Sequence, residues 1–285
     1  MAFAVEPPVT TPRNLDEAYR LLADGPWRAI AGGTDVMVQL AADVAEPPAR
    51  VLDLWRLDAL RGIALDGDAL VVGALTTYTE LRRSGAILTR LPALAEAAAT
   101  IGAVQIQNRG TLGGNIVNAS PAGDTLPLLL ATDAVFEVGG ARGERTVPVA
   151  SFWSAYRKTA LAEDELLLRV RIPLPAGRRV RFRKVGTRRA QAISKVVMGL
   201  SWRADAGAWH DVRLGLGSVA ATPIRAATTE AVLEGAPAGE VTADLAAAAL
   251  AAELQPIDDV RSTAEYRRMV SARVLHRLLR EEVSW

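Results

Sequence analysis

The sequence predicts a mixed fold of the α+β class, in a chain long enough for two domains or for one large domain built of lobes. Three observations support this prediction. A capped helix and a short apolar strand open the chain, strand-like runs separated by glycine turns fill its middle, and two helical segments close it. The 285 residues are 50% hydrophobic and 23% charged, which is the composition of a globular protein with a substantial core.

The charge balance and the absence of cysteine exclude several classes of function. The 33 basic and 32 acidic side chains nearly cancel, so no global field directs the chain towards nucleic acid or an acidic membrane surface. Without cysteine the chain has no disulfide, no thiolate nucleophile and no thiolate ligand for an iron–sulfur cluster, and its two histidines argue against a His-rich metal site. No signal-peptide pattern and no run of about 18 apolar residues occurs. We therefore expect a cytoplasmic protein without a membrane-spanning segment.

The first segment predicts a helix followed by a strand. Asn14 is placed to cap a helix over residues 15–24, with Glu17 as its capping-box partner. The apolar run that ends near Ile30 predicts a short strand.

A glycine turn follows this strand. Residues 32–35 (Gly-Gly-Thr-Asp) connect it to a helix or an extended run that begins at Val36. Such a turn presents backbone N–H groups to an anion. It matches neither the dinucleotide fingerprint G-x-G-x-x-G nor the P-loop, and a simple strand-to-helix connection also explains its glycines.

The middle of the chain predicts strands with helices between them. Residues 66–68 (Asp-Gly-Asp) form a good hairpin turn. Thr76 or Thr77 caps a helix that carries Glu80, and Pro92 opens another. Further strands are predicted within residues 134–149, where they flank a glycine-rich turn, and within residues 164–175, where prolines end the strand.

Residues 100–131 hold glycines, side-chain amides and one isolated carboxylate. Gly113 and Gly114 follow a turn at residues 109–110 and precede Asn115, so backbone N–H groups can approach a phosphate where a Cβ would block the way. Glycine pairs also occur in ordinary turns, and this alternative stays open.

Asp124 in the same stretch has two interpretations. The apolar run from Thr125 to Ala131 predicts a helix, and Pro127 falls in its first turn, where a missing N–H is harmless. Asp124 is therefore either the N-cap of this helix or a ligand-binding carboxylate.

A dense basic cluster lies between residues 178 and 189. Three interpretations of this cluster stay open: a solvated face, a site for an anionic ligand and a surface that binds an acidic protein partner. The lack of interleaved aromatic residues argues against nucleic acid as the partner. Its members are Arg178, Arg179, Arg181, Arg183, Lys184, Arg188 and Arg189.

The last third predicts a hairpin and two helices. The hairpin turns at residues 205–207, with His210 at its mouth as a surface residue. His276 in the final helix is expected to be structural, and the arginines of that helix are expected on its surface. The predicted buried stripe of this helix comprises Tyr266, Val270, Val274 and Leu278, joined by Met269, Leu275 and Leu279.

Taken together, both glycine turns, the Asp124 segment and the Lys184 segment follow the order and approximate spacing of one known family. The chain resembles the FAD-binding medium subunit of the molybdenum hydroxylases, the family of carbon monoxide dehydrogenase and xanthine dehydrogenase, over nearly its whole length. The most specific matches are AGGTD at residues 31–35 and IGAVQIQNRGTLGGNIVNASPAGD at residues 101–124. DELLLRVRIP, FRKVGTRRAQAISKV and the C-terminal helices match more weakly.

The resemblance implies a two-lobed FAD-binding fold of the vanillyl-alcohol oxidase type, followed by a C-terminal domain with a three-stranded sheet and a helical bundle. The expected divisions are an N-terminal α/β lobe at residues 1–57, a second α+β lobe at residues 58–176 and the C-terminal domain at residues 177–285.

The resemblance also assigns site residues. Residues 30–36 would enclose one side of the FAD pyrophosphate and residues 111–115 the other, Asp124 would hydrogen-bond a polar part of FAD, and Lys184 would lie near the isoalloxazine, where a cation favours the negatively charged reduced flavin. Ile101 and Leu167, or its neighbour Leu168, would line the flavin. The predicted cofactor-binding residues are Ile30, Ala31, Gly32, Gly33, Thr34, Asp35, Val36, Ile101, Gly110, Thr111, Gly113, Gly114, Asn115, Asp124, Leu167 and Lys184.

The function implied is that of an oxidoreductase subunit that transfers electrons. Electrons from a molybdenum-pterin centre on a large subunit would cross two [2Fe–2S] clusters on a small subunit, reach FAD in this chain and leave to an external acceptor, within a dimer of heterotrimers. The lack of cysteine agrees with clusters on another chain, and the basic cluster is a candidate docking site for the small subunit. No catalytic side chain and no metal ligand is predicted in this chain. The alternatives are a stand-alone FAD-dependent NAD(P)H reductase of the same superfold and a non-redox nucleotide-binding scaffold subunit.

Overall fold

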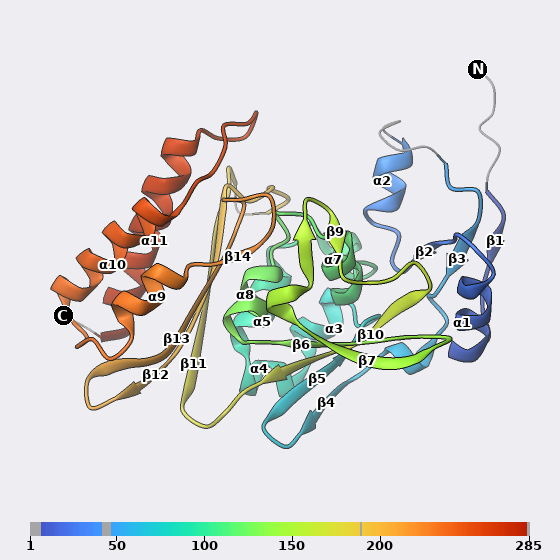
Figure 1. Ribbon diagram of the computed structural model, residues 1–285, viewed down its shortest axis with the longest axis horizontal. Helices are drawn as coiled ribbons and strands as arrows, with labels where there is room; N and C mark the ends of the chain where they lie inside the picture. The colour runs from blue at the N-terminus through green and yellow to red at the C-terminus, as the bar shows by residue number, and fades with distance from the viewer. Residues whose placement is uncertain (1–6, 42–46, 189, 284–285) are drawn as a thin grey trace.

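The computed structural model describes residues 7–41, 47–188 and 190–283. In Figure 1 they form three parts in a row, with a small N-terminal lobe, a larger central lobe of sheet and helices, and a C-terminal sheet flanked by helices. This arrangement of separate helices and sheets confirms the predicted α+β class.

The N-terminal lobe is built on a parallel three-stranded sheet of order β1-β3-β2. Asn14 caps its first helix as predicted, because Asn14 Oδ1 accepts a hydrogen bond of 2.9 Å from the amide of Glu17. The predicted capping box is wrong, because the Glu17 carboxylate accepts from the amide of Arg13, at 2.8 Å. The elements are β1 (Val9–Thr10), α1 (Leu15–Ala23), β2 (Arg28–Ile30), α2 (Val36–Ala41) and β3 (Val51–Asp53).

The central lobe contains an antiparallel sheet of order β4-β5-β10-β6-β7. The predicted turn at residues 66–68 joins β4 to β5, and Gly67 adopts the positive φ of 58° that such a turn requires. The strands of this sheet are β4 (Ile63–Asp66), β5 (Ala69–Gly73), β6 (Val135–Gly140), β7 (Gly143–Pro148) and β10 (Glu165–Pro173), while β8 (Trp153–Ala155) and β9 (Lys158–Thr159) form a separate hairpin.

Short helices cover this sheet. Thr77 is the capping residue predicted at either of two threonines, and it forms a complete capping box with Glu80. The helices are η1 (Asp58–Leu60), α3 (Tyr78–Arg83), α4 (Gly85–Arg90), α5 (Pro92–Ala99), α6 (Val104–Gln107), α7 (Leu112–Asn118), α8 (Leu126–Ala131) and η2 (Val149–Ser151).

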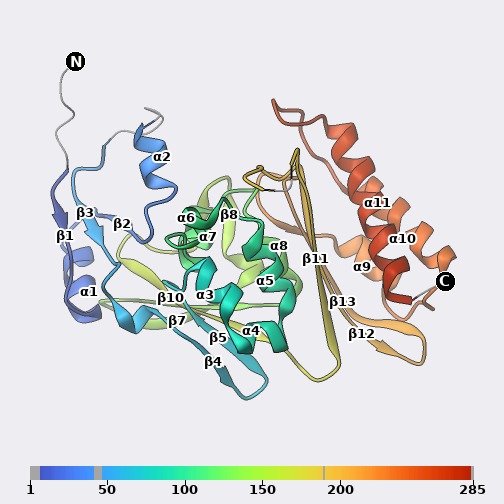
Figure 2. The same cartoon turned by 180° about the vertical axis from the view of Figure 1, so that it is seen from behind.

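The C-terminal part is an antiparallel sheet with three long strands, as the resemblance implied, and a fourth strand of two residues. Figure 2 shows helix α5 of the central lobe beside β11. The elements are β11 (Arg178–Val185), β12 (Val196–Asp205), β13 (Ala208–Gly217), β14 (Ile224–Arg225), α9 (Ala227–Leu233), α10 (Glu240–Glu253) and α11 (Ala264–Val283).

The central lobe and the C-terminal sheet join through α8. A Cβ on Gly215 would lie 2.1 Å from the carbonyl oxygen of Pro127, and one on Gly199 would lie 2.7 Å from the Cα of Leu128. The helix backbone therefore rests directly on strands β12 and β13, because these strands carry glycine where the helix crosses them.

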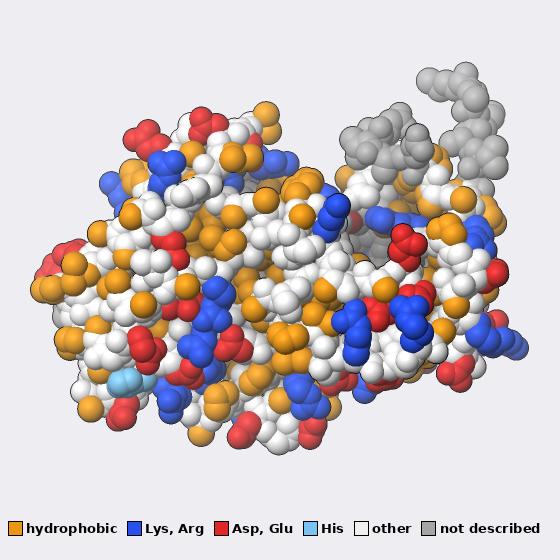
Figure 3. All heavy atoms as spheres, in the orientation of Figure 1, with side chains coloured by type: hydrophobic (Ala, Val, Ile, Leu, Met, Phe, Trp, Pro, Cys, Tyr) orange, Lys and Arg blue, Asp and Glu red, His pale blue; other side chains and the backbone are white. Residues whose placement is uncertain are grey.

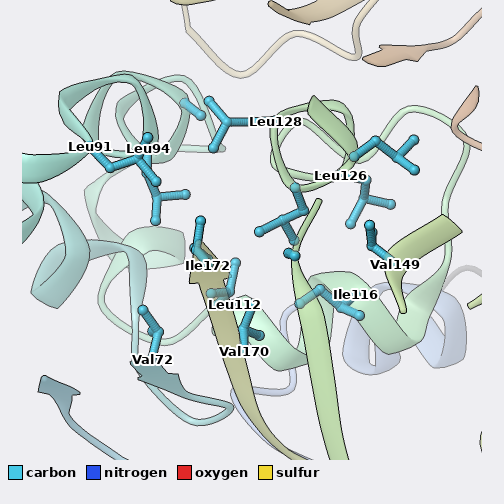
Figure 4. Close-up of a cluster of buried hydrophobic side chains, with 14 of the residues drawn as sticks. Val72, Leu91, Leu94, Leu112, Ile116, Leu126, Leu128, Val149, Val170 and Ile172 are labelled. Carbon is cyan, nitrogen blue, oxygen red and sulfur yellow. The ribbon is translucent and has the colours of Figure 1, made fainter. Parts of the chain in front are cut away.

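Three buried clusters of hydrophobic side chains correspond to the three parts. Figure 4 shows the central one, in which Leu94 of α5, Leu128 of α8 and Leu91, which lies between α4 and α5, belong to the same cluster as Val170 and Ile172 of β10. The C-terminal cluster includes Trp202 and Trp209, whose ring centroids are 5.3 Å apart, while the N-terminal one includes residues of α1, β3 and β10. The sheet strand β10 thus contributes to two clusters and fixes the N-terminal lobe on the central lobe.

The buried face of the final helix, α11, is shifted by about one residue from the predicted stripe. Its fully buried positions include Ser271, Leu275 and Leu278, whereas the predicted Met269 is 40% exposed. Arg267, expected on the surface, is buried and donates hydrogen bonds to the Ser218 carbonyl oxygen and to Asp259, at 2.6 Å for the latter. The apolar spacing located the stripe but not its centre, because buried polar residues complete it.

Candidate cofactor-binding site

A cavity of about 710 Å³ lies between the N-terminal and central lobes. Its size falls within the roughly 300–1,000 Å³ typical of small-molecule and cofactor sites. The glycine turn after β2, the first turns of α7, the β8–β9 hairpin and the start of β10 line it. Polar residues come mainly from the turn and from α7, whereas apolar residues come from several segments, among them β2, the segment after β3 and β10.

The turn at residues 32–35 lies against the turn at residues 109–110. A Cβ on Gly32 would be 1.8 Å from the carbonyl oxygen of Arg109, so only glycine permits this contact. The guanidinium of Arg109 stacks on the ring of Trp55, 3.8 Å from its centroid. Residues far apart in sequence are thereby held as one side of the cavity.

The backbone N–H groups of residues 32–35 are the distinctive feature of this turn. The structure shows no hydrogen bond donated by any of these four amides to an acceptor in residues 7–41, 47–188 or 190–283. Gly33 has a φ of 76°, which turns the chain so that consecutive amides can converge. Four unpaired amides in a cavity wall are a site for a ligand with several acceptor oxygens.

The second glycine turn is built differently. Thr111 caps α7, and its Oγ1 accepts from the amide of Gly114 at 3.0 Å. The amide of Gly113 donates to the Ala74 carbonyl oxygen at 2.8 Å, and that of Asn115 to Thr111 at 3.1 Å. These residues line the cavity, but the three amides are already used within the protein, so this turn offers close backbone approach and side-chain groups instead.

Asn115 provides such a side-chain group. Its Oδ1 accepts a hydrogen bond of 2.6 Å from Thr125 Oγ1, and in this arrangement Nδ2 is a donor at the cavity. Tyr78 also lines the cavity, and burial, with smaller effects of Asp35 and Asp124, raises the pKa of its hydroxyl above the usual value. The Tyr78 hydroxyl therefore stays protonated and can donate a hydrogen bond.

Asp124 is not the N-cap of α8, because Thr125 occupies that position and no side chain caps the helix. Instead Asp124 Oδ2 accepts from Lys184 Nζ at 2.6 Å, and Oδ1 accepts from the hydroxyl of Ser194. Lys184 also donates to the carbonyl oxygen of Thr100 at 3.2 Å. Burial raises the pKa of the Asp124 carboxyl, against the opposing effects of Lys184 and Ser194. Asp124 and Lys184 thus form a buried ion pair between the central lobe and the C-terminal sheet.

The structure brings most of the predicted site residues together. Those that line the cavity are Ile30, Ala31, Gly32, Gly33, Thr34, Asp35, Val36, Thr111, Gly113, Gly114, Asn115 and Leu167. Four others do not line it: Gly110 supports the turn of residues 32–35, Ile101 packs partly buried against the central cluster, and Asp124 and Lys184 form the ion pair.

Sequence reasoning missed several lining residues, including Trp27, Asn118 and the hairpin tip at Tyr156 and Arg157. The indole Nε1 of Trp27 is buried without a hydrogen-bond partner in the described structure. A partner for a buried indole N–H is the rule, and because Trp27 lines the cavity, this N–H is a candidate donor to a bound molecule.

Glu165 lines the cavity and should make a pH-dependent contribution to stability. Its carboxylate bonds Arg145 at 2.7 and 2.8 Å and accepts from the amide of Ala162 at 2.9 Å. The Arg145 hydrogen bond is the main cause that lowers the pKa of Glu165 from 4.5. Glu165→Gln should therefore cost about 1–2 kcal/mol of unfolding free energy at pH 7. Because the folded pKa is lowered, this difference is present above pH 4.5 and disappears as pH falls through the folded pKa.

Urea unfolding of both proteins between pH 7 and pH 3 measures this difference. The exposed Glu96 on α5 provides the control, and Glu96→Gln should change stability by less than about 0.5 kcal/mol throughout. A cost for Glu165→Gln that is constant with pH would contradict the assignment.

The basic cluster is largely neutralised by acids of the same chain. Arg178 pairs with Asp211, Arg181 with Glu282 and Arg183 with Glu281. Figure 3 shows basic and acidic side chains interspersed on the face in view. Arg189 lies outside the described residues. The run is therefore a paired strand surface, and only Arg179 and Arg188 remain as described candidates for docking a partner.

The two histidines have the surface and structural positions predicted for them. His210 is part of β13, and its Nδ1 lies 3.8 Å from Glu234. His276 on α11 has its Nε2 3.2 Å from Asp244. Neither lines the cavity.

No helix in the described parts of the chain combines the length and the apolar character needed to cross a membrane.

Two family models match the sequence: the FAD binding domain in molybdopterin dehydrogenase matches residues 2–175, and the CO dehydrogenase flavoprotein C-terminal domain matches residues 181–282.

Curated relatives match over almost the whole chain. The xanthine dehydrogenase FAD-binding subunit of Escherichia coli O157:H7 is 32% identical over 275 residues, which cover 95% of this chain and 94% of that protein. The carbon monoxide dehydrogenase medium chain of Hydrogenophaga pseudoflava is 32% identical over 274 residues and covers 94% of each.

Solved structures of similar proteins have the same fold over almost the whole chain. A chain of the carbon monoxide dehydrogenase from Hydrogenophaga pseudoflava superposes with a TM-score of 0.92 at 30% identity, covering 96% of both chains. A chain of quinoline 2-oxidoreductase from Pseudomonas putida 86 gives a TM-score of 0.91 at 26% identity, covering 99% of this chain and 98% of that chain.

Proposed function

The chain belongs to the family of FAD-binding subunits of molybdopterin dehydrogenases, and we propose that it binds FAD in the cavity between its first two lobes and serves as the electron-transfer subunit of a molybdenum hydroxylase complex. When bound, FAD supplies the redox chemistry of the subunit, whereas the chain supplies binding, orientation and electrostatics. This division accounts for a site whose described lining residues offer hydrogen-bond donors but no Ser/His/Asp arrangement and no pair of carboxylates in contact.

The observation that carries the proposal is the set of unpaired amides at residues 32–35. A diphosphate presents several acceptor oxygens, and unpaired amides at a turn are suited to bind them. The contact of Gly32 with the carbonyl of Arg109 keeps the turn in place before the ligand arrives. The amides therefore need little reorganisation on binding.

The residues present fit a large, partly polar cofactor. On the other side of the cavity, Thr111 to Asn115 would contribute the Nδ2 donor of Asn115 and a close backbone approach, and the neutral hydroxyl of Tyr78 would be a further donor. Trp27 Nε1 would find the acceptor that the described protein does not provide. Leu167 contributes apolar surface for an aromatic ring.

Asp124 and Lys184 are proposed to contact the cofactor from behind this wall. Thr125, the neighbour of Asp124, holds Asn115 by a hydrogen bond of 2.6 Å, so the ion pair adjoins a cavity residue. A carboxylate can accept more hydrogen bonds than the two that Asp124 accepts here. Ile101, whose carbonyl oxygen accepts from Gln107 at 2.9 Å, is proposed to line the flavin from the same side.

The proposed partners are a small iron–sulfur subunit with two [2Fe–2S] clusters and a large subunit with the molybdenum-pterin cofactor, in a dimer of heterotrimers in the cytoplasm. The relatives named medium chain and medium subunit support a complex with larger and smaller chains. The family resemblance supplies the direction of electron flow, from the clusters to FAD and then to an external acceptor.

Purification of the tagged chain from its own cells tests the proposal. We expect flavin absorbance with one FAD per chain, and molybdenum and iron in chains that co-purify. The isolated chain should take up FAD and lose it reversibly, because the binding groups belong to this chain.

Two other results would contradict the proposal. A chain that stays colourless after incubation with FAD would indicate a non-redox scaffold. A chain that binds FAD, lacks metal-containing partners and is rapidly reduced by NADPH would indicate a stand-alone reductase.

A further inference from the structure

The tip of the β8–β9 hairpin forms part of the cavity and has no assigned role. Tyr156 and Arg157 make the turn between the two strands, and both line the cavity. Tyr156 is 60% exposed. The tip therefore consists of two large, solvent-facing side chains beside the ligand site.

The base of this hairpin is firmly held. Trp153 is buried, and its Nε1 donates a hydrogen bond of 3.0 Å to the carbonyl oxygen of Ile116 in α7. Its ring packs edge-on against Phe136 and Phe152, with centroids 5.7 Å apart in both pairs. These contacts tie the hairpin to α7 and to the central sheet, so the tip has a defined position.

The backbone of Arg157 is in a conformation that arginine disfavours. Its φ of 55° lies in the left-handed region, at a turn position where glycine or asparagine is usual. A strained non-glycine residue beside a ligand site suggests that its side chain has a function.

Arg157 is connected to the amide turn by two hydrogen bonds. Its Nη1 donates to Asn118 Oδ1 at 2.9 Å, and Asn118 Nδ2 donates to Asp35 Oδ1 at 3.1 Å. All three residues line the cavity. The chain of contacts runs from the hairpin across the end of α7 to the turn of residues 32–35, and so it positions the guanidinium relative to the unpaired amides.

The charges around the cavity favour Arg157 as the cation for an anionic ligand. The charged lining residues are Arg28, Asp35, Arg157 and Glu165, and Glu165 is neutralised by Arg145. An arginine has five N–H donors. The described contacts of Arg157 use Nη1, together with a long Nε contact of 3.4 Å to the Tyr156 hydroxyl, so further donors remain. Arg28 has no comparable link to the amide turn in the described structure.

We propose that Arg157 is a phosphate-binding residue whose guanidinium, held by Asn118 over the turn of residues 32–35, pairs with the diphosphate of the bound dinucleotide and slows its release. The proposal rests on the proposed FAD function and adds a residue from a third segment to the site. Guanidinium groups suit this role because they bind phosphate oxygens in pairs.

The test compares the wild-type chain with Arg157→Gly and Arg157→Gln. Glycine suits the left-handed backbone, so Arg157→Gly should unfold at the same temperature as the wild type or a slightly higher one. Its FAD dissociation constant should rise about tenfold to a hundredfold at low salt, mainly through faster dissociation, because one charge-assisted contact is lost. Arg157→Gln should raise the FAD dissociation constant by a similar factor. It is the control for any folding defect that is specific to the glycine variant.

The experiment also measures FAD affinity as a function of salt concentration and includes a matched control variant. The FAD affinity of the wild type should weaken more steeply with ionic strength than that of either variant. Arg90→Gln alters an exposed arginine on α4 that does not line the cavity and should leave both affinity and salt dependence unchanged. If both Arg157 variants bind FAD with wild-type affinity and salt dependence, the proposal for Arg157 fails while the FAD function stands. If the wild-type chain binds no FAD, both proposals fail.

Discussion

Replacement of Gly32 with alanine is expected to reduce the affinity for FAD about a hundredfold or more. The new Cβ would lie 1.8 Å from the carbonyl oxygen of Arg109, a separation that no pair of non-bonded atoms tolerates. The Arg109 turn is held by stacking on Trp55 and by the hydrogen bond of 3.1 Å between the Tyr78 amide and the Gly110 carbonyl oxygen. The turn of residues 32–35 must therefore move, and a displacement of about 1 Å in binding groups has effects of this size.

Titration of the purified apo-chain with FAD, followed by fluorescence quenching, measures the change. The unfolding free energy should fall by only about 1–3 kcal/mol, the usual cost of overpacking, so circular dichroism should show a folded protein. Gly85→Ala is the matched control, because a Cβ there meets nothing within 4 Å and Gly85 begins helix α4. Retention of FAD by Gly32→Ala with near wild-type affinity would mean that the amide turn is not the diphosphate site.

The sequence was sufficient to locate the two glycine turns but not to distinguish their chemistry. Both are glycine pairs beside polar residues, and both line the same cavity. The difference lies in the hydrogen-bond acceptors for their amides. Ala74 supplies an acceptor for Gly113 from another strand end, whereas no described residue does so for residues 32–35. Such pairing depends on tertiary contacts that local sequence does not encode.

Other features that the sequence did not reveal also depend on tertiary contacts or lack a local sequence pattern. The turn at Tyr156 and Arg157 contains no glycine, asparagine or proline, so no turn pattern marks the hairpin. The sequence left open whether the arginines of β11 form a solvated face, an anion site or a docking surface, and it did not reveal that Arg181 and Arg183 pair with Glu282 and Glu281 about a hundred residues later. By contrast, the cap at Asn14 and the hairpin turn at residues 66–68 are local features, and both predictions are confirmed.

Removal of the buried carboxylate in Asp124→Ala is expected to destabilise the chain by about 3–5 kcal/mol, the usual cost of leaving a buried charge without its partner. The side chains of Asp124 and Lys184 are 9% and 10% exposed, and their charged atoms lie 2.6 Å apart. Lys184 would keep only the carbonyl oxygen of Thr100 as a described acceptor. Urea unfolding should show this loss, and FAD affinity should fall tenfold or more if one charge-assisted hydrogen bond to the cofactor is lost, a bond worth about 1.5–3 kcal/mol.

The converse variant, Lys184→Met, should lower the unfolding free energy by an amount that depends on pH. Burial raises the pKa of Asp124, and removal of the ammonium takes away the largest opposing effect, so the folded pKa of Asp124 rises further above 3.8. A carboxyl with a raised folded pKa stabilises the fold when protonated, and that stability is lost as pH rises through the folded value. The destabilisation by Lys184→Met should therefore be larger at pH 8 than at pH 5. A destabilisation that does not change with pH would show that Asp124 is not the titrating group.

The double variant Asp124→Ala with Lys184→Met separates the two roles of Asp124. Removing both charges leaves no unpaired ion in the interface, so the unfolding free energy should recover to well above the value of either single variant, with a coupling energy of about 1–3 kcal/mol. FAD affinity should not recover, because the proposed contact of Asp124 with the cofactor is still missing. If affinity returned together with stability, Asp124 would act only by joining the central lobe to β11, and the cofactor would be bound without it.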